Sequence, residues 1–256
     1  MHIACVGIGV YLFVARNDTL QNENLNTGQE QSKSELQSES KEEIQSEIVS
    51  VVVTDSTVQK AKDILNKMSI EEKVGQMFIA RCPEENAAQK VKEYHVVGYI
   101  LFGRDFLGKT KNEIVKNIKS YQDVAKIPWF IGVDEVGGMV NRVSTNTNLR
   151  SQPFLSPQKL YAKGGFNLIK SDTKEKCELL HSLGINLNFA PVCDVSQNSG
   201  DFIYKRSFGK DAKQTAEYVQ VVSTMSDEKM GSVLKHFPGY GNNADTHTGI
   251  AYDNCS

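Results

Sequence analysis

The sequence has no excess of charge of either sign. Its 256 residues carry 29 lysines and arginines against 31 aspartates and glutamates, which gives a formal net charge of -2. The basic residues are scattered along the chain rather than gathered into one stripe. Because binding of nucleic acid depends on a concentrated basic surface, we expect no nucleic acid partner.

Cysteine is scarce, and no two cysteines have the C-x-x-C spacing of zinc or redox sites. The five, odd in number and widely spaced, are Cys5, Cys82, Cys177, Cys193 and Cys255. We interpret them mostly as buried free thiols rather than as a disulfide framework. The zinc motif H-E-x-x-H is also absent, so we expect no metal and no cofactor.

No apolar run is long enough to cross a membrane alone. The run from Ile3 to Ala15 spans about thirteen residues, whereas a span needs about twenty. Its length suits a signal peptide or an anchor whose start lies upstream; the alternative is a buried hydrophobic segment. Asn17 to Ser50 is mostly Asn, Gln, Glu, Ser and Lys, a composition typical of disorder.

This layout predicts three parts: a signal or membrane-anchor remnant at 1–16, a disordered polar linker at 17–57, and a folded domain at 58–256. An apolar N-terminus, a polar tether and a folded domain are typical of a protein at the outer face of a cell. We therefore expect an extracellular or cell-surface location, with membrane attachment through the N-terminus.

The folded part alternates between helical and strand patterns. Helices are predicted near residues 59–68, from Ser69, whose spacing to Glu72 suits a capping box, from Thr110, and near 172–183 and 211–228. Short, continuously apolar strands are predicted near 96–102, 129–133, 185–190 and 232–236. Such strands between helices indicate a parallel sheet in an α/β fold.

Either an open doubly wound sheet or a (β/α)8 barrel of the TIM type would fit this pattern. Polar residues and glycines follow the C-terminal end of each strand, where both architectures place their sites. No G-x-G-x-x-G follows a strand, which removes one common reason for an open nucleotide-binding sheet. The barrel is preferred, with about its first four βα units present.

Two candidate binding groups follow the second and third predicted strands. Asp134 and Glu135 precede two glycines, with Arg142 further on, and a carboxylate there could grip sugar hydroxyls or cap the next helix. Arg206 lies in a long loop, where it could clamp an anionic or hydroxylated ligand or only brace the loop.

The densest chemical cluster follows the last predicted strand. Lys235 and His236 end that strand, and Asp245 and His247 follow in the next loop. An Asp two residues before a His can orient and polarise the imidazole, as in a proton-transfer pair. The same residues could hold a metal, but they lack a recognisable zinc spacing.

Taken in order, these segments resemble the N-terminal domain of glycoside hydrolase family 3, in its bacterial β-N-acetylhexosaminidase branch. The matching segments are VDEVGG at 133–138 with Arg142, GINLNFAPV at 184–192 with Asp194, RSFG at 206–209, and KHFPGYG at 235–241 with DTH at 245–247. The resemblance covers roughly Val58 to Asn254. Tyr240 departs from it, because many members have His at that position.

The resemblance implies a (β/α)8 barrel and an O-glycosyl hydrolase acting with retention on terminal β-linked N-acetylglucosamine or N-acetylhexosamine. It implies that the saccharide is bound by Asp134, Arg142, Arg206, Lys235 and His236. It also implies that His247 is the general acid/base and Asp245 its partner.

The family's nucleophilic Asp follows a later strand, so we expect it beyond Ser256 and expect this chain alone to be inactive. Peptidoglycan or chitin-type material is the expected source of the N-acetylglucosamine-containing saccharide. The alternatives are a β-glycosidase of other specificity and a non-catalytic saccharide-binding surface protein.

Overall fold

A computed structural model describes residues 56–226 and 230–250. The expected anchor lies outside these residues, as does the expected linker apart from its last two positions, which belong to a helix. In the described part of the chain, no helix combines the length and the apolar character needed to cross a membrane.

Residues 56–73 belong to a unit of their own, described here by itself. It contains helix α2 (Ser56–Lys67) and the first residues of helix α3 (Ile70–Gly75). The Ser69 amide donates to the Glu72 carboxylate at 2.9 Å, and the Glu72 amide donates to the Ser69 hydroxyl at 3.2 Å. This reciprocal pair confirms the helix start predicted from the spacing of the two residues.

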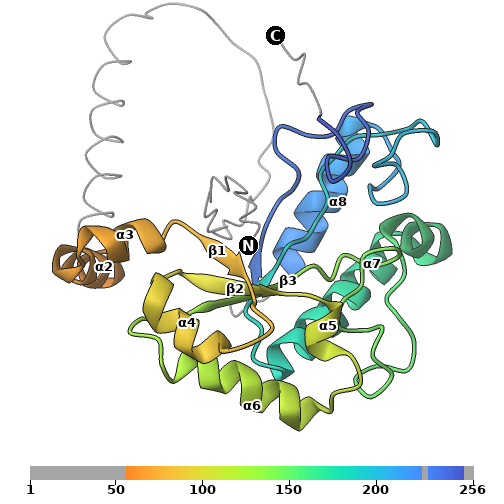
Figure 1. Cartoon of the computed structure of the whole chain (residues 1–256). Coiled ribbons are helices and arrows are strands. Elements are labelled where there is room, and N and C mark those ends of the chain that lie inside the picture. Colours follow the sequence, from red (N-terminus) through yellow and green to blue (C-terminus); the bar gives the residue numbers. More distant parts are fainter. Residues whose placement is uncertain (1–55, 227–229, 251–256) are drawn as a thin grey trace, which may run out of the picture. The chain divides into compact units, whose positions relative to one another are not determined.

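The second unit contains a parallel sheet of five strands in the order β1-β2-β3-β4-β5 (Figure 1). The strands are β1 (Ile79–Arg81), β2 (Gly98–Leu101), β3 (Phe130–Val133), β4 (Leu187–Asn188) and β5 (Gly231–Ser232). The helices are α4 (Ala87–Tyr94), α5 (Gly103–Phe106), α6 (Lys111–Gln122), α7 (Pro157–Ser182) and α8 (Ala212–Met225). Strands in sequence order that alternate with helices are the beginning of a (β/α)8 barrel, which confirms the predicted fold class.

Two elements differ from the expectation. Strand β1 was not predicted, because three residues ending in Arg81 are too short to show a pattern. Helix α7 begins at Pro157, well before the predicted start. It is kinked at Gly164 and Gly165, whose backbones are non-helical, so its apolar residues do not keep one helical period.

Residues 103–110 have the G-x-x-x-x-G-K-T spacing of phosphate-binding loops. In the structure the short helix α5 fills this segment. Lys109 donates to the carbonyl of Asp105 at 2.9 Å, and Thr110 caps α6. A phosphate-binding loop needs open backbone amides and a lysine free to reach the phosphate, so the segment is a helix connection here.

The sheet has an outer face packed against helices and an opposite inner face. Tyr99, Leu101, Ile131 and Val133 share one buried cluster with residues of α4, α6 and α7. Because side chains alternate along a strand, the residues between and after these positions point to the inner face. The inner face therefore carries the side chains that follow β2 and β3, among them Asp134.

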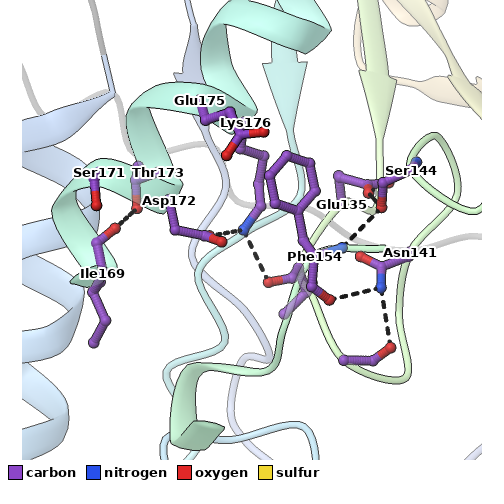
Figure 2. Close-up of polar contacts among 12 residues, drawn as sticks. Glu135, Asn141, Ser144, Phe154, Ile169, Ser171, Asp172, Thr173, Glu175 and Lys176 are labelled. Atoms are coloured by element: carbon purple, nitrogen blue, oxygen red, sulfur yellow. Dashed lines mark hydrogen bonds and ion pairs between the residues drawn. The ribbon is translucent and has the colours of Figure 1, made fainter. Parts of the chain in front are cut away.

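The loop between β3 and α7 is fastened to α7 by Lys176, whose buried ammonium is paired with Asp172 of the same helix. Lys176 donates to the Asp172 carboxylate at 3.0 Å and to the Val136 carbonyl at 3.3 Å, and its ammonium lies 5.0 Å from the centre of the Phe154 ring (Figure 2). The side chains of Lys176 and Asp172 are only 9% and 8% exposed. Lys176 thus contacts both ends of the loop, which begins at Asp134, and Asp172 balances its charge.

Replacing Lys176 with Met should destabilise the fold by roughly 3–5 kcal/mol, because Asp172 would remain buried without a counter-charge. The double variant Asp172→Leu/Lys176→Met should recover most of the loss. Lys174→Met, an exposed control on the same helix, should change stability by less than about 1 kcal/mol. Urea unfolding measures all three, and a loss below about 1 kcal/mol for Lys176→Met would contradict the role of the pair.

Candidate active site

Four ionisable side chains meet beyond the C-terminal ends of three neighbouring strands. Asp134 follows β3, Asp194 lies beyond β4, and Lys235 and His236 lie beyond β5. Because the strands are parallel and paired in sequence order, their C-terminal ends lie at the same edge of the sheet. The candidate site is built on this edge.

Asp134 and Lys235 form an ion pair through Oδ1 and Nζ that links the ends of β3 and β5. Both side chains are largely buried, at 18% and 13% exposure. Burial lowers the pKa of Lys235, and the positive charges of Arg206 and Arg142 lower it further, while Asp134 opposes the shift. Asp134 therefore pairs across the sheet edge, and both arginines lie close enough to affect Lys235.

Asp194 accepts three hydrogen bonds, and its side chain is almost fully buried. Its Oδ2 receives the His236 amide at 3.0 Å and lies 2.7 Å from His236 Nδ1, while its Oδ1 receives the Tyr240 amide at 2.7 Å. Its side chain is 1% exposed. Burial acts to raise the pKa of Asp194, but the hydrogen bonds from His236 and Tyr240 outweigh it, so the pKa lies below its usual value.

The contacts of His236 define its tautomer. Nη2 of Arg206 lies 3.3 Å from His236 Nε2. A guanidinium can only donate, so Nε2 accepts and Nδ1 carries the proton donated to Asp194. Arg206 is thereby drawn into the cluster and is not only a brace for its own loop.

Arg142 is placed by its neighbour Glu135 in the same loop. Glu135 is 0% exposed and accepts the amides of Arg142 at 2.7 Å, Val143 at 2.8 Å and Ser144 at 3.2 Å. It also accepts the Ser144 hydroxyl (Figure 2). The second acid of the motif is therefore used to shape the loop, whereas the first, Asp134, faces Lys235.

Asp245 and His247 form the pair that their spacing suggested. His247 Nδ1 lies 2.6 Å from Asp245 Oδ1, and the His247 amide donates to the same oxygen at 3.0 Å. The backbone hydrogen bond from His247, followed by the side-chain one, lowers the pKa of Asp245. The His247 side chain is 78% exposed, so its free Nε2 is open to solvent.

Tyr240 connects this loop to the buried cluster. Its hydroxyl lies 2.8 Å from the Thr246 hydroxyl, between Asp245 and His247 in the chain, and its ring meets the His236 ring edge to face. Its amide is one of the three donors to Asp194. Tyr240 was noted in the sequence only as a departure from the family pattern, and its contacts give that departure a structural role.

The structure thus brings Asp134, Lys235, His236 and Arg206 together and sets Arg142 near Lys235. It pairs Asp245 with His247 on the adjoining loop. The structural role of Asp194 was not predicted, although the sequence places this residue after a predicted strand. That role depends on hydrogen bonds from backbone amides, and such bonds leave no residue-type signal in a sequence.

Asp194→Asn should cost roughly 1.5–3 kcal/mol of stability at pH 7, the range for hydrogen bonds to a charged group. Because the pKa of Asp194 is lowered by folding, its contribution is present above the unfolded value of about 3.9 and is lost as the pH falls through the folded value. The difference in unfolding free energy between wild type and variant should therefore decrease below about pH 4. Denaturant unfolding from pH 7 to pH 3 measures this difference, and a difference that stays constant would contradict the role of Asp194.

The chain is similar to known proteins in both sequence and structure. The family model described as the glycosyl hydrolase family 3 N terminal domain matches residues 69–256. A β-hexosaminidase of Shewanella frigidimarina is 34% identical over 165 residues, which cover 62% of this chain and 46% of that protein. The β-hexosaminidase LpqI of Mycobacterium tuberculosis is 29% identical over 189 residues, covering 71% of this chain and 46% of that protein.

Among solved structures, a family 3 β-N-acetylglucosaminidase from Paenibacillus sp. FPU-7 aligns with a TM-score of 0.62 and 27% identity. The alignment covers 70% of this chain and 35% of that one. The chain spans about half, or less, of the length of the curated relatives it matches.

Proposed function

The chain belongs to glycosyl hydrolase family 3, and from this premise we propose that it forms the saccharide-binding and acid/base part of a retaining β-N-acetylhexosaminidase. Its substrate would be a terminal β-linked N-acetylglucosamine or a related N-acetylhexosamine. The observation that carries the proposal is the buried cluster at the strand ends, where Asp134 pairs with Lys235 and Arg206 meets His236.

The cluster suits a neutral, hydroxyl-rich ligand. Asp134 offers acceptor oxygens, while Lys235 and Arg206 offer donors, so that adjacent sugar hydroxyls could be bound through both their hydrogen and their oxygen. Asp134 and Lys235 are attached near strand ends of a packed sheet, and Arg206 reaches them from the loop between β4 and α8, where its contact with His236 holds it. The relatives named as β-hexosaminidases support N-acetylhexosamine as the bound sugar.

The pair of Asp245 and His247 would transfer the proton. Asp245 holds Nδ1 of the imidazole, which leaves Nε2 to protonate the leaving oxygen and later to accept a proton from water. Retention also needs a carboxylate nucleophile, which attacks the anomeric carbon and forms a glycosyl-enzyme intermediate that water then hydrolyses. The family resemblance assigns that carboxylate to a later strand than those described.

The setting of the reaction follows from the N-terminal composition. The apolar segment and polar tether support a location outside the cell, with attachment to the membrane through the N-terminus. Saccharides containing N-acetylglucosamine in that place are those of peptidoglycan or chitin-type material.

His247→Ala should lower turnover of N-acetylglucosaminides with poor leaving groups by roughly 10²- to 10⁴-fold, the usual range for general acid catalysis. Activated aryl glycosides, which need little protonation, should lose less in the glycosylation step. The assay uses a form of the chain extended by the later barrel strands, with His181→Ala on α7 as a control that also removes one exposed imidazole. Equal losses for both kinds of substrate, with glycosylation limiting, would remove His247 as the acid.

A further inference from the structure

Tyr240 lies between the buried cluster at the strand ends and the loop that carries the acid/base pair. It is only 6% exposed. The centre of its ring lies 4.8 Å from that of His236, edge to face, and 5.2 Å from that of Phe202. Its amide donates to Asp194 at 2.7 Å. Packing thus holds the ring while the hydrogen bond holds the backbone, which fixes the direction in which the hydroxyl points.

The hydroxyl of Tyr240 joins this packed residue to the acid/base loop. It lies 2.8 Å from Oγ1 of Thr246, six residues further along the chain. The glycines on either side of Tyr240 have φ of 116° and 52°, in the left-handed region that favours glycine, so the chain can turn sharply there. Thr246 separates the two members of the acid/base pair. The hydroxyl therefore fastens the loop at its chemically central residue.

The other hydrogen bonds described for the pair shape the loop from within. His247 is bound to Asp245 through its ring and its amide, and Thr248 donates its amide and its hydroxyl to the Asp245 carbonyl, both at 3.1 Å. The His247 side chain is 78% exposed. These bonds set the distance between the two members of the pair. The contact between Tyr240 and Thr246 relates the pair to the buried cluster.

We propose that the hydroxyl of Tyr240, acting through Thr246, holds the imidazole of His247 in place beside the bound sugar, which makes Tyr240 a positioning residue. A general acid must lie within about 2.6–3.2 Å of the oxygen that it protonates. A misplacement of about 1 Å can cost about 100-fold in rate. The inference rests on the proposed function, because it takes His247 as the acid.

Tyr240→Phe removes the hydroxyl and keeps the ring that packs against His236. In the form of the chain extended by the later barrel strands, it should lower kcat for N-acetylglucosaminides with poor leaving groups by roughly 5- to 50-fold, because the acid is misplaced. KM should change by less than about 2-fold, since Asp134 and Lys235 still contact the sugar. Activated aryl glycosides should lose less, because they need little protonation.

Further variants show whether the effect passes through Thr246 and His247. Thr246→Val, which lacks only the hydroxyl, should reproduce the loss, and Thr246→Ser, which keeps it, should retain most of the activity. Adding Tyr240→Phe to His247→Ala should cause no further loss of turnover. Tyr94→Phe, at an exposed tyrosine of α4, is the control and should leave the kinetics unchanged.

An unchanged kcat in Tyr240→Phe, or an equal loss for both kinds of substrate while glycosylation is limiting, would overturn the inference. A further loss in the His247→Ala background would also overturn it, because Tyr240 would then act elsewhere. Thermal unfolding checks that Tyr240→Phe is folded; if it is not, the two variants of Thr246, an exposed residue, decide in its place.

The His247→Ala variant separates this inference from the proposed function. If its loss depends on the leaving group while the variants of Tyr240 and Thr246 show none, the proposed function stands and the inference fails. If its loss does not depend on the leaving group, the acid/base assignment fails, and the inference with it.

Discussion

The ion pair between Asp134 and Lys235 is the contact on which the site depends. It joins the end of β3 to the end of β5 across the intervening strand, and it is largely closed to solvent. A lysine buried among cations has a lowered pKa, and Asp134 supplies the opposing charge. The pair is therefore held by the sheet, and both its members remain at the edge where a ligand would arrive.

Some of the charged side chains around this pair stabilise the site, and others remain available to a ligand. Glu135 and Asp194 are almost fully buried and accept hydrogen bonds from backbone amides, which fixes the loops carrying Arg142 and Tyr240. Arg81 of β1 and Arg142, by contrast, lie over the Phe102 ring and have no described counter-charge. A carboxylate that looks catalytic in the sequence can thus be structural, as Glu135 is.

Much of the fold could be predicted because its signals are local. The capping boxes at Ser69 and Thr110 mark helix starts through contacts only three residues apart, and continuous apolar runs mark the buried strands. Strand β1 was missed because three residues give no period, and the start of α7 because two glycines interrupt its pattern. Cys82, Cys177 and Cys193 form no disulfide with a described residue, as expected.

The site was predictable to the extent that it lies in ordered motifs. These motifs put Asp134, Lys235 and His236 at or just after the ends of predicted strands and Arg206 in the loop between two of them. The sequence could not reveal that Asp194 accepts three hydrogen bonds, that Glu135 serves the backbone, or that Arg81 stacks on Phe102. The contacts of Asp194 and Arg81 join residues far apart in the chain, and those of Glu135 depend on how its own loop folds. The G-x-x-x-x-G-K-T spacing shows the converse, because it is a local motif that forms a helix connection here and not a phosphate-binding loop.

The central claim is that the strand-end cluster around Asp134 and Lys235 binds N-acetylglucosamine. The most direct measurement is calorimetric titration of the chain with N-acetylglucosamine and with glucose, repeated for Lys235→Met and for the exposed control Lys116→Met. The account predicts a preference for N-acetylglucosamine, a loss of roughly 1–3 kcal/mol of binding free energy in Lys235→Met, and no change in the control. Binding that is unchanged in Lys235→Met would place the sugar elsewhere and contradict the account.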